Sequence, residues 1–290
     1  MRNRLPFWFK QSLPDARVKY ILSLLKELNV NTICVSGKCP NLNSCFKEKN
    51  LTFLILGDTC SRNCNFCAVK KSNFPNTDIK DEPLRIKEIV KILNLDFVVI
   101  TSVCRDDLED KGISIFEEVV REIKGISQNI KIELLIPDFG KDKELINCIA
   151  NLGVEVIGHN IEVPFRLYPI IKPKGDYRAS LEVLKMIKKI NPKVVTKSSL
   201  ILGLGEKEEE VIETIRDLRE VGLDILTLSQ YLSPSERHYP VKEFLSLDKF
   251  NYYKEVALKE GIPQVFSGPL VRSSYRAKEL YFQFLKKNYG

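Results

Sequence analysis

The chain has 290 residues, of which 44% are hydrophobic and 29% are charged, and its formal net charge is +7. This composition is typical of a globular protein with a sizeable core, and no apolar run approaches the roughly 18 residues needed to cross a bilayer. Acidic residues are interleaved with the basic ones, so the charge favours acidic partners and excludes a basic nucleic-acid-binding tail. The charged start of the chain has no signal-peptide pattern, which predicts a cytoplasmic protein without a membrane or nucleic-acid partner.

Short apolar runs alternate with amphipathic stretches from residue 51 onward. The runs are rich in Val, Ile, Leu and Thr, as are strands that are buried on both faces. We expect strands at Thr52–Leu56, Phe97–Thr101, Lys131–Ile136, Val154–Ile157, Val194–Ile201 and Ile225–Ser229. We expect helices, from apolar residues spaced three and four apart, near 84–94, 113–124, 142–151, 178–190, 206–221, 248–260 and 276–288.

This alternation predicts an α/β fold with a parallel sheet and right-handed crossovers. Six strand–helix units suit an incomplete parallel (β/α)6 barrel better than a closed eightfold one. We expect one compact unit made of an N-terminal extension (1–50), the partial barrel (51–230) and a C-terminal extension (231–290). In such barrels the functional side chains follow the C-terminal ends of the strands.

Eight cysteines are present, and six of them fall within residues 34–67. A cytosolic chain keeps its thiols reduced, so this density predicts metal ligands rather than disulfides. The six form two triads, which are Cys34, Cys39 and Cys45, and then Cys60, Cys64 and Cys67.

The second triad in chain order lies in GDTCSRNCNFCAV, residues 57–69, directly after the first expected strand. Three thiolates from one short loop can hold three irons of a four-iron cluster and leave the fourth iron open to a substrate. A structural zinc site is the alternative, and it needs a fourth ligand from elsewhere in the chain.

The upstream triad lies in TICVSGKCPNLNSCF, residues 32–46, with four and then five residues between its cysteines. This spacing belongs to neither a zinc ribbon nor a ferredoxin, and it indicates a second cluster. Each of these cysteines taken alone could be a buried small hydrophobic residue. Near the C-terminus, GPLVRSSYRA (268–277) contains two serines, which taken alone would be turn or helix-cap residues.

The triad at 60–67 resembles the signature of the radical S-adenosylmethionine superfamily, with Phe66 as the aromatic residue before its last cysteine. The resemblance implies a barrel of the radical SAM type in which the open iron of a 4Fe-4S cluster binds S-adenosylmethionine. The segment from Ser199 to Glu206 resembles the superfamily's adenine motif, with Ser199 in place of a glycine, and implies that Ile201 packs near the adenine. An ordinary strand-to-helix turn is the alternative for this segment.

Asn160 and Glu162 follow the fourth expected strand, where contacts with the ribose or methionine part of S-adenosylmethionine are expected. A turn cap is the alternative, and His159 beside them could be a structural histidine with all its hydrogen bonds made.

Longer segments of the chain, in order, resemble the lipoyl synthase family. In that family the upstream triad holds an auxiliary 4Fe-4S cluster, which implies that Cys34, Cys39, Cys45 and Ser274 are its ligands, with Ser273 the less favoured serine. An oxygen ligand suits an iron–sulfur cluster poorly, so it can leave when the cluster gives up sulfide. Arg272 could contact this cluster or form a surface ion pair. The segments are RLPFWFKQSLP (4–14), LTFLILGDTCSRNCNFCAV (51–69), ITSVCRDDLEDKG (100–112), GHNIE (158–162), LGLGE (202–206), QYLSPSERHYPV (230–241) and RSSY (272–275).

The resemblance implies a radical sulfurtransferase that inserts two sulfur atoms at C6 and C8 of an octanoyl-lysine on a lipoyl-accepting protein. It also implies two 4Fe-4S clusters, S-adenosylmethionine as cosubstrate, and an electron donor such as ferredoxin or flavodoxin. Two alternatives stay open, which are a biotin-synthase-like sulfur-inserting enzyme and a zinc-stabilised binding module.

Cys104 departs from the family pattern TSVDRDDL, because cysteine stands in this chain for the first aspartate. We expect Cys104 and Cys148 to be free thiols rather than ligands of a third cluster.

Overall fold

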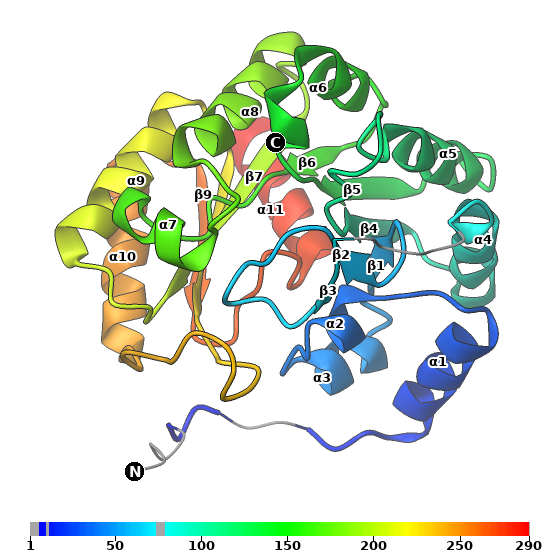
Figure 1. The fold of residues 1–290 in the computed structure, drawn as a ribbon, viewed down its shortest axis with the longest axis horizontal. Helices are drawn as coiled ribbons and strands as arrows, with labels where there is room; N and C mark the ends of the chain where they lie inside the picture. Colours follow the sequence, from blue (N-terminus) through cyan, green and yellow to red (C-terminus); the bar gives the residue numbers. More distant parts are fainter. Residues whose placement is uncertain (1–5, 10–11, 74–78, 290) are drawn as a thin grey trace.

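A computed structural model describes residues 6–9, 12–73 and 79–289 (Figure 1). Its main sheet has the order β1-β4-β5-β6-β7-β8-β9, and every neighbouring pair of strands is parallel. The strands are β1 (Thr52–Ile55), β4 (Phe97–Ser102), β5 (Lys131–Leu135), β6 (Val156–Gly158), β7 (Val195–Leu202), β8 (Ile225–Gln230) and β9 (Gln264–Gly268).

The helices that connect successive strands form an arc outside the sheet, and the remaining helices lie inside or below this arc (Figure 1). The outer helices are α4 (Glu82–Leu93), α5 (Ile113–Lys124), α6 (Lys143–Ala150), α8 (Tyr177–Ile190), α9 (Glu208–Glu220) and α10 (Leu247–Lys259). The others are α1 (Ala16–Glu27), α2 (Ile33–Ser36), α3 (Leu42–Lys47), α7 (Tyr168–Ile171) and α11 (Ala277–Tyr289), with 3₁₀ turns at Phe139–Lys141 and Phe165–Leu167.

Helix α4 illustrates why these segments are helical. Pro83 stands in the first turn, where its missing N–H costs nothing, and the buried Ile86, Ile89 and Leu93 recur at helical spacing. The helix ends at Asn94, whose φ of 50° is the left-handed conformation of a helix C-cap. Its apolar face packs against the sheet as part of the larger hydrophobic core.

The prediction of an incomplete parallel barrel is confirmed. All six expected strands are present in the expected order, and the edge strands β1 and β9 do not pair with each other in the described part of the chain. The sheet also contains β9, a five-residue strand that was not predicted and that lies within the segment 231–290. The C-terminal segment therefore also contributes to the barrel.

Alternate residues of each strand point to opposite faces of the sheet. On β7, Leu200 and Leu202 pack outward with α9 in one core cluster, whereas Val195 packs inward with the residues Tyr281 and Phe284 of α11. Lys197 shares the inward face and forms an ion pair of 2.8 Å with Glu133 on β5. The barrel interior therefore has a polar layer above a floor made by α11.

The N-terminal helices α1 to α3 lie below β1 in the view of Figure 1, at the open side of the barrel, with α2 next to β1 and α1 farther out. Thr32 forms an antiparallel bridge with Phe53, and the Asn31 carbonyl accepts a hydrogen bond of 2.9 Å from the Leu54 N–H. Among the described residues, no helix is long and apolar enough to span a membrane.

Candidate metal and cofactor site

The triad Cys60, Cys64 and Cys67 lies on a loop that leaves the C-terminal end of β1. Its two ends, β2 (Thr59–Cys60) and β3 (Lys70–Lys71), pair in parallel and close the loop into a compact unit. All three thiols are partly buried and none forms a disulfide. The structure therefore brings together the three cysteines that the sequence predicted to act together.

The loop is fixed by hydrogen bonds to several other elements. The Ser61 N–H donates to the Cys104 carbonyl across 3.0 Å, and the Asn65 N–H donates to the Ile171 carbonyl across 2.9 Å. From the segment after β8, His238 Nε2 lies 3.1 Å from the Cys67 carbonyl oxygen. A loop held at three points can present its thiols in one geometry.

Arg62, between the first two cysteines, forms a fork of charge-assisted hydrogen bonds. Its guanidinium donates to both carboxylate oxygens of Asp138 at 2.6 and 2.7 Å, and to both oxygens of Asp106 at 2.8 Å. Burial alone would raise the pKa of Asp138, but the hydrogen bonds and charge of Arg62 hold it well below its usual range. These pairs tie the loop to the ends of β4 and β5.

The thiols of the loop differ in their electrostatic surroundings. Burial raises the pKa of Cys67 to about 12 and also raises the pKa of Cys64, which nearby Lys172 opposes. Hydrogen bonding from the Cys104 thiol lowers the pKa of Cys60 to about 6. The Cys104 N–H lies 3.3 Å from Cys60 Sγ, so Cys104 is a direct neighbour of the triad.

The chain enters this loop through a tight turn that a buried carboxylate holds. Leu56 and Gly57 both have positive φ, of 67° and 87°. Glu82, in the first turn of α4, accepts their two N–H groups at 2.7 and 2.9 Å. Burial raises the pKa of Glu82 to about 7 in spite of these hydrogen bonds.

The residues predicted to contact S-adenosylmethionine also come together. The Glu162 N–H donates to the Ser199 carbonyl at 2.9 Å, and the Ile201 N–H donates to the Glu162 carbonyl at 2.8 Å. Asn160 donates through Nδ2 to Glu162 Oε1 at 3.0 Å. Phe66 of the cysteine loop packs against the same core cluster as Ile201. The ends of β6 and β7 and the cysteine loop thus surround one region of the barrel mouth.

Two buried acceptor atoms in this region have no hydrogen-bond partner in the described part of the chain, namely His159 Nε2 and Asn160 Oδ1. His159 Nδ1 lies 2.9 Å from the Ile136 carbonyl oxygen, so this nitrogen carries the proton. Burial lowers the pKa of His159 to about 4, which keeps the ring neutral and leaves Nε2 as an acceptor. The expectation of a histidine with all its hydrogen bonds made is therefore not met within the described part of the chain, where Nε2 has no partner.

Lys172 is a buried cation in the same region that the sequence analysis did not single out. Its Nζ donates to the Asn160 carbonyl at 3.3 Å and lies 5.0 Å from the centre of the Tyr168 ring. Burial would lower its pKa, but the charges of Tyr168, Glu162 and Cys64 raise the pKa overall. The sequence offered no signal for it, because a lysine in PIIKPKG is ordinary for an exposed loop.

The upstream triad lines a cavity between the N-terminal helices, β1, β4 and the segment after β9. Cys34 lies on α2 and Cys45 on α3, and the Cys39 N–H donates to the Cys34 carbonyl at 3.0 Å. Burial, followed by the charge of the neighbouring thiols, raises the pKa of both Cys34 and Cys45 to about 12. Cys34 and Cys45 are therefore protonated until a metal displaces their protons.

The C-terminal motif reaches the same cavity from the opposite end of the sequence. Ser274 and Arg272 both line the cavity, whereas Ser273 does not. Helix α11 begins at Ala277, so the motif forms a turn before the helix. Burial lowers the pKa of Arg272, and the Cys39 thiol opposes this effect. Three thiols and one hydroxyl around one cavity are a donor set that fits an iron–sulfur cluster with one oxygen ligand.

The two triads lie at different levels of the same strand. Thr52, the first residue of β1, lines the upstream triad's cavity, and the cysteine loop begins just beyond the other end of β1. Four residues of extended strand separate these levels by about 13 Å.

The remaining candidates lie apart from this arrangement. Cys148 is exposed on α6 and, like Cys104, forms no disulfide. Glu206 accepts the N–H groups of Gly203 and Leu204, so its side chain closes the turn after β7. Among the described residues, no three His, Cys, Asp or Glu side chains are grouped so as to hold a single metal ion.

Comparison with known families gives a match over most of the barrel and close relatives over the whole chain. The Radical SAM superfamily model matches residues 54–218. The chain is 47% identical to lipoyl synthase from Caldicellulosiruptor saccharolyticus, over 96% of this chain and 98% of that protein. It is 47% identical to lipoyl synthase from Alkaliphilus metalliredigens, over 96% of both chains. It is 43% identical to mitochondrial lipoyl synthase from Branchiostoma floridae, over 98% of this chain and 77% of that protein.

Solved structures resemble the fold at much lower identity. Streptococcus suis SuiB bound to S-adenosylmethionine superposes with a TM-score of 0.58 at 12% identity, over 81% of this chain and 57% of SuiB. The hydrogenase maturase HydG from Carboxydothermus hydrogenoformans gives 0.56 at 14% identity, over 80% of this chain and 65% of HydG. At these identities the likeness establishes the barrel architecture alone.

Proposed function

The chain belongs to the lipoyl synthase family of the radical SAM superfamily, and on this premise we propose how its two cysteine triads divide the work of sulfur insertion. The enzyme inserts two sulfur atoms, at C6 and C8, into an octanoyl chain carried on a lysine of a lipoyl-accepting protein. The observation that carries the proposed division is that the upstream triad shares one cavity with Ser274, away from the loop of the other triad.

Cys60, Cys64 and Cys67 would hold the 4Fe-4S cluster that works with S-adenosylmethionine. When bound, this cluster would supply the electron that cleaves S-adenosylmethionine to a 5′-deoxyadenosyl radical, which removes a hydrogen atom from the octanoyl chain. Arg62 holds the loop in place through its two carboxylate partners, and the turn held by Glu82 sets where the loop leaves β1. These residues position the thiols and do not react themselves.

Phe66, Asn160, Glu162, Ser199 and Ile201 would bind S-adenosylmethionine, with Ile201 near the adenine and Asn160 and Glu162 near the ribose or methionine part. His159 joins this set, because its neutral Nε2 and the neighbouring Asn160 Oδ1 are buried acceptors without a partner in the described part of the chain. A buried acceptor without a donor costs about 1–3 kcal/mol, so a ligand that brings N–H or O–H groups is favoured. S-adenosylmethionine brings ribose hydroxyls and amino groups.

Lys172 is suited to the carboxylate of the same cosubstrate. It is buried near Cys64 of the loop. Among the described residues, no acidic side chain lies within the 4.0 Å of its Nζ that would make an ion pair. A buried cation attracts an anionic ligand more strongly than an exposed one, because water does not screen it. Two molecules of S-adenosylmethionine would be consumed for each lipoyl group, so this site must bind twice per product.

Cys34, Cys39, Cys45 and Ser274 would hold the auxiliary 4Fe-4S cluster, which supplies the sulfur. The serine oxygen is a poor match for iron in an iron–sulfur cluster, so it can be released more easily than a thiolate. Ser274 is favoured over Ser273 because only Ser274 lines the cavity. The separation of about 13 Å along β1 leaves room for the octanoyl chain between the two sites.

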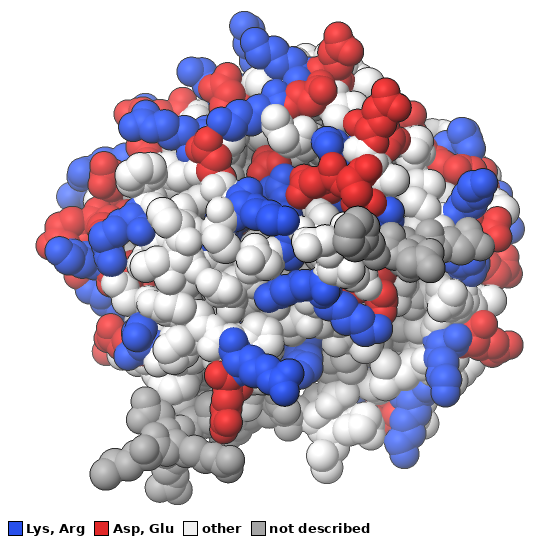
Figure 2. Space-filling view, in the orientation of Figure 1, with Lys and Arg blue, Asp and Glu red and all other residues white. Residues whose placement is uncertain are grey.

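The lipoyl-accepting protein would approach the barrel mouth. Figure 2 shows lysine and arginine side chains across the middle of this face, next to a group of acidic side chains. Lys70 and Lys71 of the cysteine loop are exposed. A basic surface speeds the approach of an acidic partner. An electron donor such as ferredoxin or flavodoxin would use the same face, because it must deliver electrons to the loop.

Iron and sulfide content after anaerobic reconstitution tests the two-cluster assignment. We expect about eight irons in the wild type and about four in the Cys60/Cys64/Cys67→Ala variant, since each triad accounts for four. Four irons or fewer in the wild type would remove the auxiliary cluster and favour a biotin-synthase-like enzyme with a different second site. Zinc in place of iron would support the binding-module alternative.

A further inference from the structure

Arg272 stands out among the residues that line the cavity of the upstream triad. The cavity has two cationic side chains, Arg272 and Lys278. Lys278 forms an ion pair of 2.5 Å with Asp96, and its side chain is 44% exposed, so its charge is already balanced. Arg272 forms no ion pair with an acidic side chain anywhere in residues 6–9, 12–73 and 79–289. No acidic side chain of the described residues therefore balances its charge.

The Arg272 side chain is held in place by its own turn. Nη1 donates to the Val271 carbonyl at 2.6 Å and to the Pro269 carbonyl at 3.3 Å. Tyr275 stacks on Phe266 of β9, with ring centres 6.2 Å apart and an interplanar angle of 13°. Arginine has five N–H donors, and Nε and Nη2 make no hydrogen bond to the protein in the part of the chain that the structure describes. Donors and charge therefore remain available to whatever fills the cavity.

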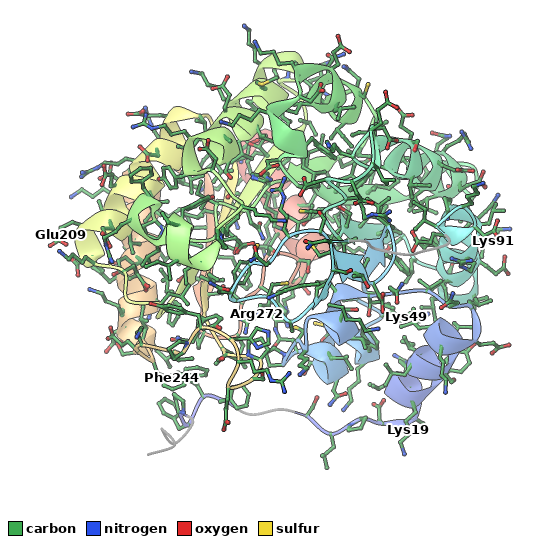
Figure 3. All side chains as sticks on the ribbon, viewed as in Figure 1. Lys19, Lys49, Lys91, Glu209, Phe244 and Arg272 are labelled. Carbon is green, nitrogen blue, oxygen red and sulfur yellow. The ribbon has the colours of Figure 1, made fainter. Side chains whose placement is uncertain are left out.

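The position of Arg272 fits an anionic occupant. Figure 3 shows Arg272 near the middle of the view, whereas Glu209, Lys91 and Lys19 lie near the outline. Three cysteine thiolates and a serine alkoxide would bring more negative charge than the iron–sulfur core offsets. The bound cluster, counted with its ligands, would therefore carry a net negative charge. Charge and hydrogen bonds beside such a group set its reduction potential. A guanidinium is also weakly hydrated and always charged, which suits a partly buried place.

We propose that Arg272 is a positioning residue of the auxiliary site, whose guanidinium offsets the negative charge of the bound cluster and donates N–H groups to it. This inference rests on the proposed assignment of Cys34, Cys39, Cys45 and Ser274 as the cluster's ligands. Its consequence is that Arg272 raises the reduction potential of the auxiliary cluster and slows the loss of its iron. Reduction adds negative charge, and a fixed positive charge nearby favours the more negative state.

The test compares four variants in a parent protein in which Cys60, Cys64 and Cys67 are alanine, so that the auxiliary cluster is observed alone. Arg272→Gln removes the charge, and Arg272→Lys keeps it. Arg276→Gln removes an equal charge from a side chain that is 43% exposed. Asn41→Ala breaks the hydrogen bond to the Leu270 carbonyl, which loosens the same turn without changing its charge.

The measurements are the midpoint potential from an anaerobic redox titration and the rate of iron release to a chelator. We expect Arg272→Gln to shift the potential to a more negative value and to release iron severalfold faster. Arg272→Lys should stay close to the parent. Arg276→Gln should shift the potential less than Arg272→Gln does, because the Arg276 charge near Cys45 is partly screened by water. Asn41→Ala should speed iron release without shifting the potential.

Several outcomes would overturn the role of Arg272. These are an unchanged potential in Arg272→Gln, an equal shift in Asn41→Ala, or a lysine variant that behaves like the glutamine variant. If Arg272→Gln binds no iron, the lysine variant decides, since only a charge effect predicts that lysine restores binding. Failure of the parent to bind about four irons would contradict the auxiliary cluster itself, and so is distinguishable from failure of the Arg272 inference.

Discussion

The side-chain amide of Asn41 donates a hydrogen bond of 2.5 Å to the backbone carbonyl of Leu270, which lies 229 residues later in the chain. Asn41 precedes α3, which carries Cys45, and Leu270 lies in the turn that carries Arg272 and Ser274. This single contact therefore joins the two segments that line the auxiliary cavity. It does so across the open side of the barrel, where β1 and β9 are not paired.

Replacing Asn41 by alanine should loosen this junction. We expect the free energy of unfolding to fall by about 1 kcal/mol, the usual value of one hydrogen bond. Cleavage of S-adenosylmethionine should persist, because the loop of Cys60 does not touch Asn41. Denaturant unfolding and 5′-deoxyadenosine formation measure the two effects. Loss of cleavage in this variant would contradict the separation of the two sites.

Replacing Asp138 by asparagine should damage the cysteine loop. The side chains of Asp138 and Arg62 are only 7% and 10% exposed, so the change leaves a nearly buried charge with one partner fewer. We expect a loss of about 3 kcal/mol in stability and at least a tenfold loss of S-adenosylmethionine cleavage. Asp106→Asn is the matched control, because Asp106 is 38% exposed and should cost less than about 1 kcal/mol. Equal effects of the two changes would refute the importance of burial.

Ser274→Ala should separate the two halves of the reaction. The triad of Cys60, Cys64 and Cys67 is untouched, so the variant should still form 5′-deoxyadenosine at close to the wild-type rate. Sulfur insertion should fall by at least tenfold, because the auxiliary site loses its one oxygen ligand. Ser273→Ala, the neighbouring control, should retain both activities. Liquid chromatography with mass spectrometry of both products distinguishes these results, and a deficit in cleavage itself would count against this division.

His159 should make stability depend on pH. Its pKa is about 4 in the folded protein and about 6.5 in the unfolded chain, so only the unfolded chain binds the proton between these values. The stability that this difference contributes is complete above pH 6.5 and is lost as the pH falls toward 4. Between pH 7 and pH 5 the loss should be about 2 kcal/mol.

His159→Asn is the comparison for this prediction, because its amide can still donate to the Ile136 carbonyl while it does not titrate. The difference in unfolding free energy between wild type and variant should shrink by about 2 kcal/mol from pH 7 to pH 5. Denaturant titrations at both values measure it. A difference that does not change with pH would mean that His159 titrates in the folded protein as it does in the unfolded chain.

The ion pair of Lys197 and Glu133 inside the barrel should be sensitive to the loss of one partner only. Their side chains are 2% and 3% exposed. Lys197→Met leaves a buried carboxylate and should cost about 3–5 kcal/mol, whereas Lys197→Met with Glu133→Leu should recover most of this loss. Thermal unfolding of both variants checks the prediction, and a double variant as unstable as the single one would refute it.

The sequence predicted the barrel because its strands are unusually regular. Six apolar runs alternate with helical periods, and this pattern determines both the parallel sheet and the end of the sheet where side chains gather. Strand β9 could not be found in the same way, because Gln264–Gly268 is short, follows Pro263 and has only Val265 and Phe266 as apolar residues. Its place is determined by pairing with β8.

The cysteines could be grouped from sequence because their ligand spacing is local. The contribution of His159 and Lys172 could not, since both depend on burial between elements that are distant in sequence. Asn160 and Lys172 become neighbours only when α7 folds back over the end of β6. The choice between Ser273 and Ser274 likewise depends on the direction of one turn, which sequence patterns do not specify.

The most direct test of the central claim is the isotopic composition of the product in a single anaerobic turnover. The protein is reconstituted with ³⁴S-labelled sulfide, freed of excess sulfide and given an octanoyl-lysine peptide, S-adenosylmethionine and a reductant. We predict a lipoyl product that carries two ³⁴S atoms, and no lipoyl product from the Cys34/Cys39/Cys45→Ala variant, which should still form 5′-deoxyadenosine. A product with unlabelled sulfur, or sulfur insertion by that variant, would contradict the assignment of the upstream triad as the source of sulfur.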